Sequence, residues 1–298
     1  MKPTPFLLAT IALATGFSCE SEKQTPPAEP EETQGRAFGE PKLAVKLSDE
    51  AVNESSGLAR SHEEAGWYYT HNDSGDSARF WKFDLTGKMA GPYTIPGAKA
   101  VDWEDMASAK IGGKSFLYFA DFGDNQERRT SVQIYRIEEP KGTDAGPIGK
   151  VDVFELTYPD KAHNAETLLV NPLTEEFTIV TKTTAESSLV FTLKNPKPGT
   201  HKMAKVGEWE IGEAAEPARL TTGGDFSPEG RFVVVRTYLA AYEFELPFSG
   251  EWWKTKPVKI KTAAELQGEA IAYSRDGKTL LTTSEFKPCP VSVIEIRQ

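Results

Sequence analysis

One outline recurs five times along this chain and constrains its fold more than any other feature. Each copy has an acidic or hydroxyl residue, a short β-forming run, a turn and a second, strongly β-forming run. The matching polar residues are 48, 62, 56 and 47 positions apart. A period of about 50 residues is typical of the four-stranded blade of a β-propeller. The copies span residues 54–76, 102–125, 164–183, 220–238 and 267–286.

The segments between the copies supply the outer strands. Two further β-rich runs follow each of the first four copies, but only one, in residues 290–298, follows the fifth. Residues 42–49 are expected to provide the missing strand and close the ring, which leaves no free sheet edge. The sequence therefore predicts an all-β fold, a five-bladed β-propeller with four strands per blade, over residues 41–298. Six blades is the alternative, although no sixth inner strand is evident.

The N-terminus has the pattern of an export signal. Lys2 precedes a short apolar run, which is too short to span a bilayer. We expect residues 1–18 to be a signal peptide. The following Cys19 resembles the lipidated cysteine of bacterial lipoproteins, although Gly16 stands where their signals usually have Leu. Lipidation of Cys19 is the prediction, and ordinary cleavage near Ala14 is the alternative.

The next segment has the composition of a linker. Residues 20–40 hold six Glu and three Pro and almost nothing apolar, so they cannot bury a core. We predict a disordered, lipid-anchored linker over residues 19–40, which places a monomeric domain in the bacterial cell envelope, attached to a membrane only through its lipid. The chain has a formal net charge of −10 and no Lys/Arg cluster, which excludes nucleic acid and favours a cation as partner.

Propeller geometry gathers the repeated polar residues at one place. The first strand of each blade lines the central channel, so the matching residues are expected to point into it near one face. Carboxylates aimed at one axis repel each other unless a cation lies between them. Oxygen ligands without Cys or His indicate Ca²⁺ first and Mg²⁺ second. The alternative is that these glutamates only make turn hydrogen bonds. The five candidate ligands are Ser56, Glu104, Glu166, Thr222 and Glu269.

The ends of the second strands should lie on the same face, because each second strand runs antiparallel to the first. Asp73, His71 and His163 are candidates for a general base near the metal. Lys182 and Arg236 are expected to hold an anionic substrate. Three acidic residues are predicted to share this substrate-binding face: Asp121, Asp124 and Glu285.

The order Ser, Glu, Glu, hydroxyl, Glu at the five inner positions resembles the soluble calcium-activated nucleotidases (apyrases). That resemblance implies a five-bladed propeller with calcium on its axis, held here by the five candidate ligands, with Thr222 replacing a Ser. It also implies hydrolysis of nucleoside di- and triphosphates. The phrases HNDSGD, DWED, ADFGDN and QGEAIAYS are closer to uncharacterised bacterial β-propeller lipoproteins.

Two functions follow as expectations. One is a calcium-dependent hydrolase of a small, phosphate-bearing anion. The other is a non-catalytic propeller that calcium stabilises and that binds a small ligand or a protein partner. A lactonase-like activity is a further option, although the lactonase propellers with axial calcium are six-bladed. The sequence contains no P-loop, GxSxG or HExxH motif, which argues against those chemistries.

Overall fold

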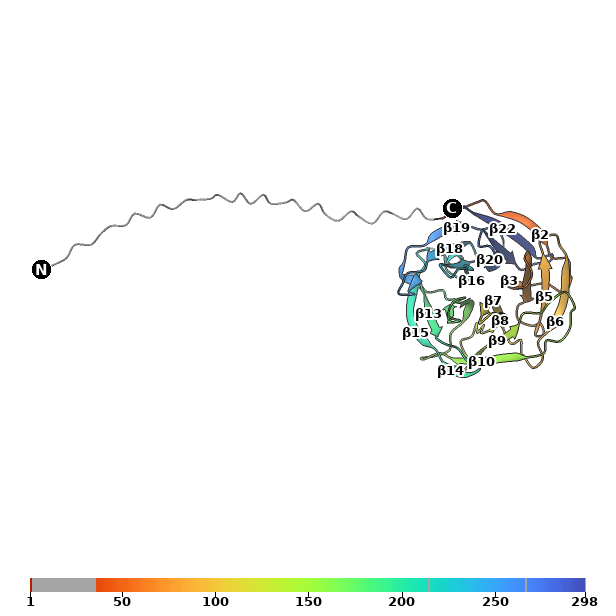
Figure 1. Cartoon of the computed structure of the whole chain (residues 1–298), viewed down its shortest axis with the longest axis horizontal. Coiled ribbons are helices and arrows are strands. Elements are labelled where there is room, and N and C mark those ends of the chain that lie inside the picture. Colours follow the sequence, from red (N-terminus) through yellow and green to blue (C-terminus); the bar gives the residue numbers. More distant parts are fainter. Residues whose placement is uncertain (2–35, 214, 266, 298) are drawn as a thin grey trace. The chain divides into compact units, whose positions relative to one another are not determined.

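The computed structural model describes residues 1, 36–213, 215–265 and 267–297. Within them the chain forms five sheets around a central axis (Figure 1). The predicted signal peptide, Cys19 and most of the predicted linker lie outside the described residues. No helix among the described residues has the length and apolar character needed to cross a bilayer.

Five inner strands surround the axis, and each lies against the next around the ring (Figure 1). They come from the five copies of the repeat, which confirms the five-bladed propeller. These strands are β3 (Ser55–Arg60), β7 (Trp103–Ile111), β11 (Ala165–Val170), β16 (Thr221–Phe226) and β20 (Gly268–Tyr273).

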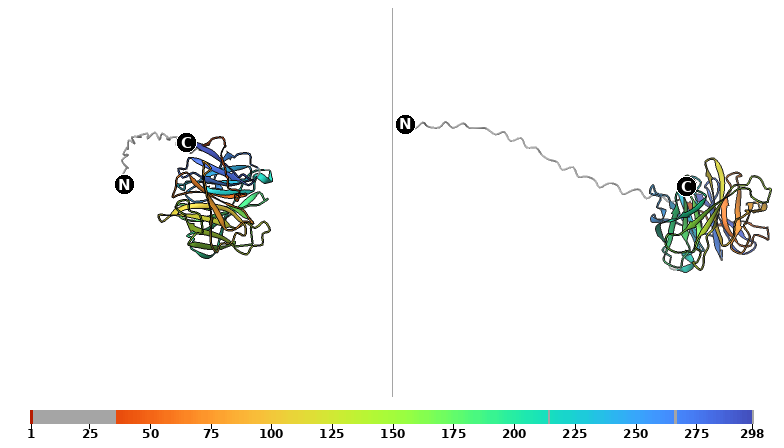
Figure 2. Two further views of the ribbon diagram at one scale, coloured as in Figure 1. Left: turned by 90° about the vertical axis from the view of Figure 1, so that its right-hand side faces the viewer. Right: turned by 90° about the horizontal axis from the view of Figure 1, so that it is seen from below.

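Each inner strand continues outward into an antiparallel sheet, and Figure 2 shows these blades from two sides. Blade one adds β4 (Trp67–Asn72), β5 (Arg79–Asp84) and β6 (Met89–Thr94). Blade two adds β8 (Lys114–Asp121), β9 (Val132–Glu138) and β10 (Val151–Thr157). Blade three adds β12 (Phe177–Thr181), β13 (Ser187–Leu193) and β15 (Ala204–Glu210). Blade four adds β17 (Phe232–Thr237), β18 (Ala240–Glu245) and β19 (Val258–Lys261).

The fifth blade joins the two ends of the domain. After β20 come β21 (Thr279–Ser284) and β22 (Pro290–Arg297), and the fourth strand is β2 (Lys42–Lys46). In Figure 1 the orange β2 lies beside the dark blue β22. The predicted closure of the ring by residues 42–49 is therefore confirmed.

The domain begins earlier than residue 41. A short strand β1 (Ala37–Phe38) pairs with the far end of β22, where Ala37 lies opposite Arg297. Arg36 donates hydrogen bonds to Glu243 at 3.1 Å and to the carbonyl of Gly277 at 2.9 Å. These contacts correct the predicted end of the linker at residue 40. The proline- and glutamate-rich composition of residues 20–40 gave no sign that Ala37–Phe38 would pair with the edge of β22.

Three short elements lie outside the repeat. Strand β14 (Gly199–Lys202) leaves blade three and pairs in parallel with β10, so it covers the outer edge of blade two. The 3₁₀ turn η1 (Glu216–Ala218) lies in the connection from blade three to blade four, and η2 (Trp252–Lys254) lies between β18 and β19 of blade four. None of these elements was predicted.

Aromatic side chains fill the space between blades. Phe80 of blade one packs on Phe119 of blade two, with ring centroids 4.9 Å apart, and Trp103 is 1 % exposed in the same cluster. Burying one such side chain contributes roughly 1.5–3 kcal/mol. Trp252 is also buried, at 1 % exposure. This packing holds the inner strands in fixed positions around the channel.

Candidate cation site at the channel mouth

The same irregularity occurs at the start of all five inner strands. Ser55 lies opposite Asn72 and Gly57 opposite His71, so Ser56 between them has no partner. Such a β-bulge re-aims a side chain and is common next to functional sites. The corresponding shifts in the other blades occur at Glu104, Glu166, Thr222 and the pair Glu269–Ala270. The five candidate ligands thus share one structural position, at the end of the channel that we call the mouth.

A repeated backbone hydrogen bond brings a second set of residues to the mouth. The first or second residue after each second strand donates its N–H to the loop before the inner strand, over 3.0–3.3 Å. The donors are Asp73, Gly123, Lys182, Tyr238 and Glu285, and their acceptors are Glu54, Asp102, Asn164, Leu220 and Gln267. Asp102 and Tyr238, which sequence reasoning did not single out, are therefore residues of the mouth.

Three carboxylates meet between blades one and two. Asp73, Asp102 and Glu104 each have a carboxylate oxygen within 4.8 Å of the others. A Cβ atom on Gly123 would lie 2.1 Å from Glu104 Oε1 and 2.5 Å from Asp102 Cγ, so only glycine leaves room for this cluster. Of these acids, the sequence predicted Glu104 as a ligand and Asp73 as a base. The DWED motif was the signal for Asp102.

Two carboxylates at the mouth are buried without a hydrogen-bond partner among the described residues. Glu104 and Glu269 are each 3 % exposed. Burial raises the pKa of Glu104 well above its usual range, and the neighbouring Glu166 raises it further. Burial, followed by Glu166, likewise raises the pKa of Glu269 to about 8. Protons or a cation that neutralise these groups would lower the cost of burying them. They do not make the turn hydrogen bonds of the alternative interpretation.

Glu166 differs because an ammonium group already pairs with it. Lys182 Nζ lies 2.6 Å from Glu166 Oε1 and 2.5 Å from Oε2, and it donates to the Tyr238 hydroxyl at 2.6 Å. Burial still raises the pKa of Glu166 to about 7, although Lys182 opposes the shift. The structure therefore brings Lys182 to the mouth, where the sequence placed it, but as the partner of a predicted ligand.

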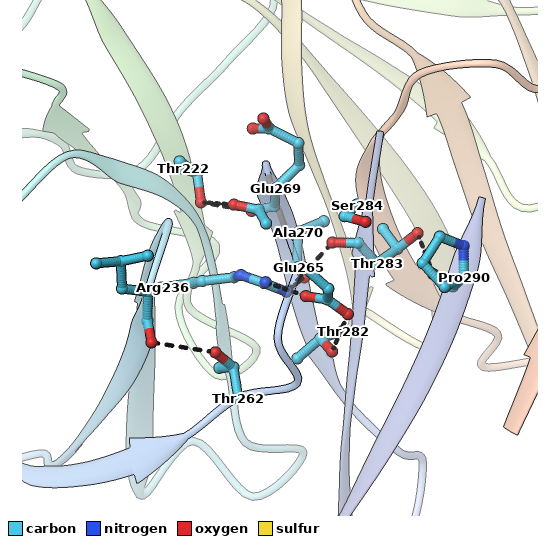
Figure 3. A network of polar contacts seen from close by, with 12 residues as sticks. Thr222, Arg236, Thr262, Glu265, Glu269, Ala270, Thr282, Thr283, Ser284 and Pro290 are labelled. Carbon is cyan, nitrogen blue, oxygen red and sulfur yellow. Dashed lines mark hydrogen bonds and ion pairs between the residues drawn. The ribbon is translucent and has the colours of Figure 1, made fainter. Parts of the chain in front are cut away.

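The two hydroxyl residues link neighbouring blades. Ser56 Oγ donates to the carbonyl of Glu104 at 2.6 Å. Thr222 Oγ1 lies 2.8 Å from the carbonyl of Gly268 and 2.7 Å from that of Glu269 (Figure 3). Because each hydroxyl proton points at a carbonyl, the oxygen lone pairs stay available to accept or to bind a cation.

Arg236 lies in the interior, which corrects its predicted place on the binding face. Its side chain is 0 % exposed and forms an ion pair with Glu265 (Figure 3). It also donates to the carbonyls of Ala270 at 3.0 Å and Thr283 at 3.2 Å. Arg236 is one residue short of the end of β17, so its side chain packs between blades while Tyr238 occupies the mouth position.

Neither predicted catalytic histidine contacts the acidic cluster. His71 is fully buried, where Nδ1 lies 2.8 Å from the carbonyl of Asn72 and the ring packs on Trp103. His163 is 5 % exposed, and its Nε2 lies 3.0 Å from Asp160 Oδ1. His71 is thus a core residue, contrary to the prediction of a general base.

The burial of His71 has a measurable pH consequence. Burial lowers the pKa of His71 to about 4 from 6.5. Below pH 6.5 the His71 side chain is protonated in the unfolded chain but stays neutral in the folded chain. The free energy of unfolding therefore decreases as the pH falls from 6.5 towards 4, and this residue accounts for about 3 kcal/mol of the decrease. We expect NMR to show a neutral His71 ring at pH 5 in the folded protein. A titration midpoint above pH 6 would contradict this expectation.

Two predicted substrate-binding aspartates instead build the loop after β8. Asp121 pairs with Arg129 at 2.9 Å and accepts the backbone N–H of Asp102 at 3.1 Å. Asp124 accepts the backbone N–H groups of Arg128 and Arg129, both at 2.6 Å. Their role is to position the loop and Asp102. Glu285, by contrast, is a half-buried residue of the mouth, and burial raises its pKa.

A small cavity opens beside the mouth at blade three. Its volume is about 170 Å³, and its lining includes Lys161, His163, Asn164, Lys182 and Thr183. A larger cavity of about 450 Å³ lies away from the mouth, lined by Tyr93, Glu138 and residues 144–150. Asn164 and Lys182 therefore join the mouth to a cavity of a size suited to a small polar group.

Comparison with known proteins supports the architecture. No known family and no curated protein matches this sequence. The PQQ-bound aldose sugar dehydrogenase of Streptomyces coelicolor is similar in structure with a TM-score of 0.52 and 11 % identity, over 92 % of this chain and 100 % of that chain. A putative 6-phosphogluconolactonase of Bacteroides uniformis has a TM-score of 0.41 and 20 % identity, over 83 % and 69 %. At 11 % identity, the likeness to the dehydrogenase shows the fold alone. The sheet topology of the described residues makes this chain a five-bladed β-propeller.

Proposed function

We propose that the channel mouth binds a divalent cation, with Ca²⁺ preferred, and that this cation serves hydrolysis of a small, phosphate-bearing anion. The observation that carries the proposal is the cluster of Asp73, Asp102 and Glu104, whose carboxylate oxygens lie within 4.8 Å of one another. Within it Glu104 is 3 % exposed, and its side chain has no hydrogen-bond partner among the described residues. Buried carboxylates without partners are costly unless protons or a cation neutralise them.

The donor set fits a hard cation. Asp73, Asp102 and Glu104 can approach one ion together, and Ca²⁺ accepts six to eight oxygen ligands in flexible geometry. The hydroxyl of Ser56, which donates to the carbonyl of Glu104, offers a neutral oxygen beside this set. When bound, the ion would polarise a substrate oxygen. Asp73 is half-buried, and burial raises its pKa, which suits it to accept a proton from water.

A cation that only stabilises the fold is the second candidate. It is favoured by the way Ser56 joins blade one to blade two and Thr222 joins blade four to blade five. A cation beside these contacts would tie together neighbouring blades without any chemistry. Cation-dependent turnover of a phosphate ester distinguishes the first candidate from the second.

Calcium should raise the thermal stability of the protein, and Glu104→Gln should remove most of that effect. A ligand that binds only the folded state stabilises it by about 2.7 kcal/mol at a hundredfold excess over its Kd. Metal analysis and melting curves with and without EDTA measure the effect, and a screen of phosphate esters tests hydrolysis. The matched control is Glu138→Gln, an exposed glutamate paired with Lys114. An identical melting curve in EDTA, with no metal bound, would reject the cation.

A further inference from the structure

Lys182 forms an ion pair with Glu166, one of the five candidate ligands of the cation. Its ammonium group contacts both oxygens of Glu166, and its side chain is only 13 % exposed. Tyr238 accepts a third hydrogen bond from the same nitrogen. All three ammonium protons are therefore engaged at the mouth, and Glu166 has its charge neutralised from within the protein.

An ammonium group and a divalent cation compete at such a position. Glu166 lies at the bulge of β11, the strand beside β7, at the position equivalent to Glu104, so a cation bound by Glu104 would also attract Glu166. Like charges a few ångströms apart repel by several kcal/mol where water is scarce. A cation at the mouth would therefore weaken the hold of Glu166 on Lys182.

The cavity of about 170 Å³ gives the displaced ammonium group a second place, because Lys182 also lines it. The hydroxyls of Thr183 and Ser187 on its wall can donate to an anion. Lys161 also lies on the wall, where it pairs with Glu127. Thr183 Oγ1 accepts the N–H of Ala185 at 3.1 Å, which leaves its own proton to donate. Several donors around a small volume suit a group with several acceptor oxygens, such as a phosphoryl group.

We propose that Lys182 couples the two sites: it neutralises Glu166 without a cation and binds the phosphoryl group of the ligand in the adjoining cavity when a cation takes Glu166. This inference rests on the proposed cation site. Its consequence is positive coupling, in which calcium and the anion each raise the affinity for the other by the same factor.

The test is calorimetric titration of the purified full chain with Ca²⁺, with and without inorganic phosphate kept below the precipitation limit. Lys182→Met should bind Ca²⁺ about tenfold more tightly than the unmodified chain, because it removes a competing charge. Phosphate should raise the calcium affinity of the unmodified chain about fivefold and that of Lys182→Met not at all. Lys205→Met, which removes an exposed lysine paired with Glu208, is the control and should behave as the unmodified chain.

The outcomes separate this inference from the proposed function. If neither chain binds Ca²⁺, the cation site and the coupling both fail. If Ca²⁺ binds but Lys182→Met gives no tighter binding, or phosphate changes nothing, only the coupling fails. Lys182→Gln keeps a hydrogen-bond donor and replaces the methionine variant if that one does not fold. Its calcium affinity should also exceed that of the unmodified chain.

Discussion

Replacing Arg236 with methionine is expected to lower the free energy of unfolding by about 3–5 kcal/mol. The change leaves Glu265, whose side chain is 4 % exposed, as an unpaired buried carboxylate. It also removes the donor to the carbonyls of Ala270 and Thr283. Urea denaturation measures the loss. Lys254→Met is the control, because Lys254 is an exposed residue paired with Glu251 and should cost less than about 1 kcal/mol.

A second variant separates the loss of the ion pair from the loss of side-chain packing at Arg236. Adding Glu265→Gln to Arg236→Met removes the stranded charge and should recover part of the lost stability. The contrary outcome is an Arg236→Met variant as stable as the unmodified protein but weaker in anion binding. That result would support the original prediction that Arg236 binds the anionic substrate.

Asp105→Ala should destabilise the propeller by roughly 3–5 kcal/mol, since two backbone N–H groups of other blades would lose their acceptor. Asp105 on β7 accepts two backbone hydrogen bonds. One comes from the N–H of Leu168 on β11, at 2.9 Å, and the other from the N–H of Gly224 on β16, at 3.2 Å. One buried carboxylate therefore joins three blades across the channel. Its loss should be visible in the same urea measurement.

The control for Asp105 is Ser108→Ala on the same strand. Ser108 is also buried, but its hydroxyl has no hydrogen-bond partner among the described residues. Removing that hydroxyl should leave stability nearly unchanged. Equal stability of the two variants would mean that the contacts of Asp105 with β11 and β16 contribute little.

The sequence was sufficient to predict the propeller because each blade repeats the same inner pair of strands. Spacing alone placed Ser56, Glu104 and their equivalents at one level, and the structure puts a bulge at each. The missing strand of the fifth blade was predictable for a similar reason, since an open ring leaves an unpaired edge at β22.

The residues of the mouth were harder to predict. Lys182 and Glu285 each follow their inner residue by 16 positions, and the same offset from Thr222 gives Tyr238. The charge of Arg236, two residues earlier, made it the more conspicuous candidate, although a strand residue at that point packs between blades. Asp102 was missed because its equivalents in other blades include Asn164 and Leu220, so no repeated chemistry marks that position.

Arg36 and strand β1 lie at the end of the ring opposite the mouth. Strand β22 starts at the level of the mouth and runs away from it, because β20, β21 and β22 alternate in direction. Ala37 pairs with Arg297 at the distal end of β22, and Arg36 contacts the turn at Gly277. Arg36 therefore lies at the rear of the propeller. A link to a surface or to another protein made at Arg36 would leave the acidic mouth facing outward and open to ligands.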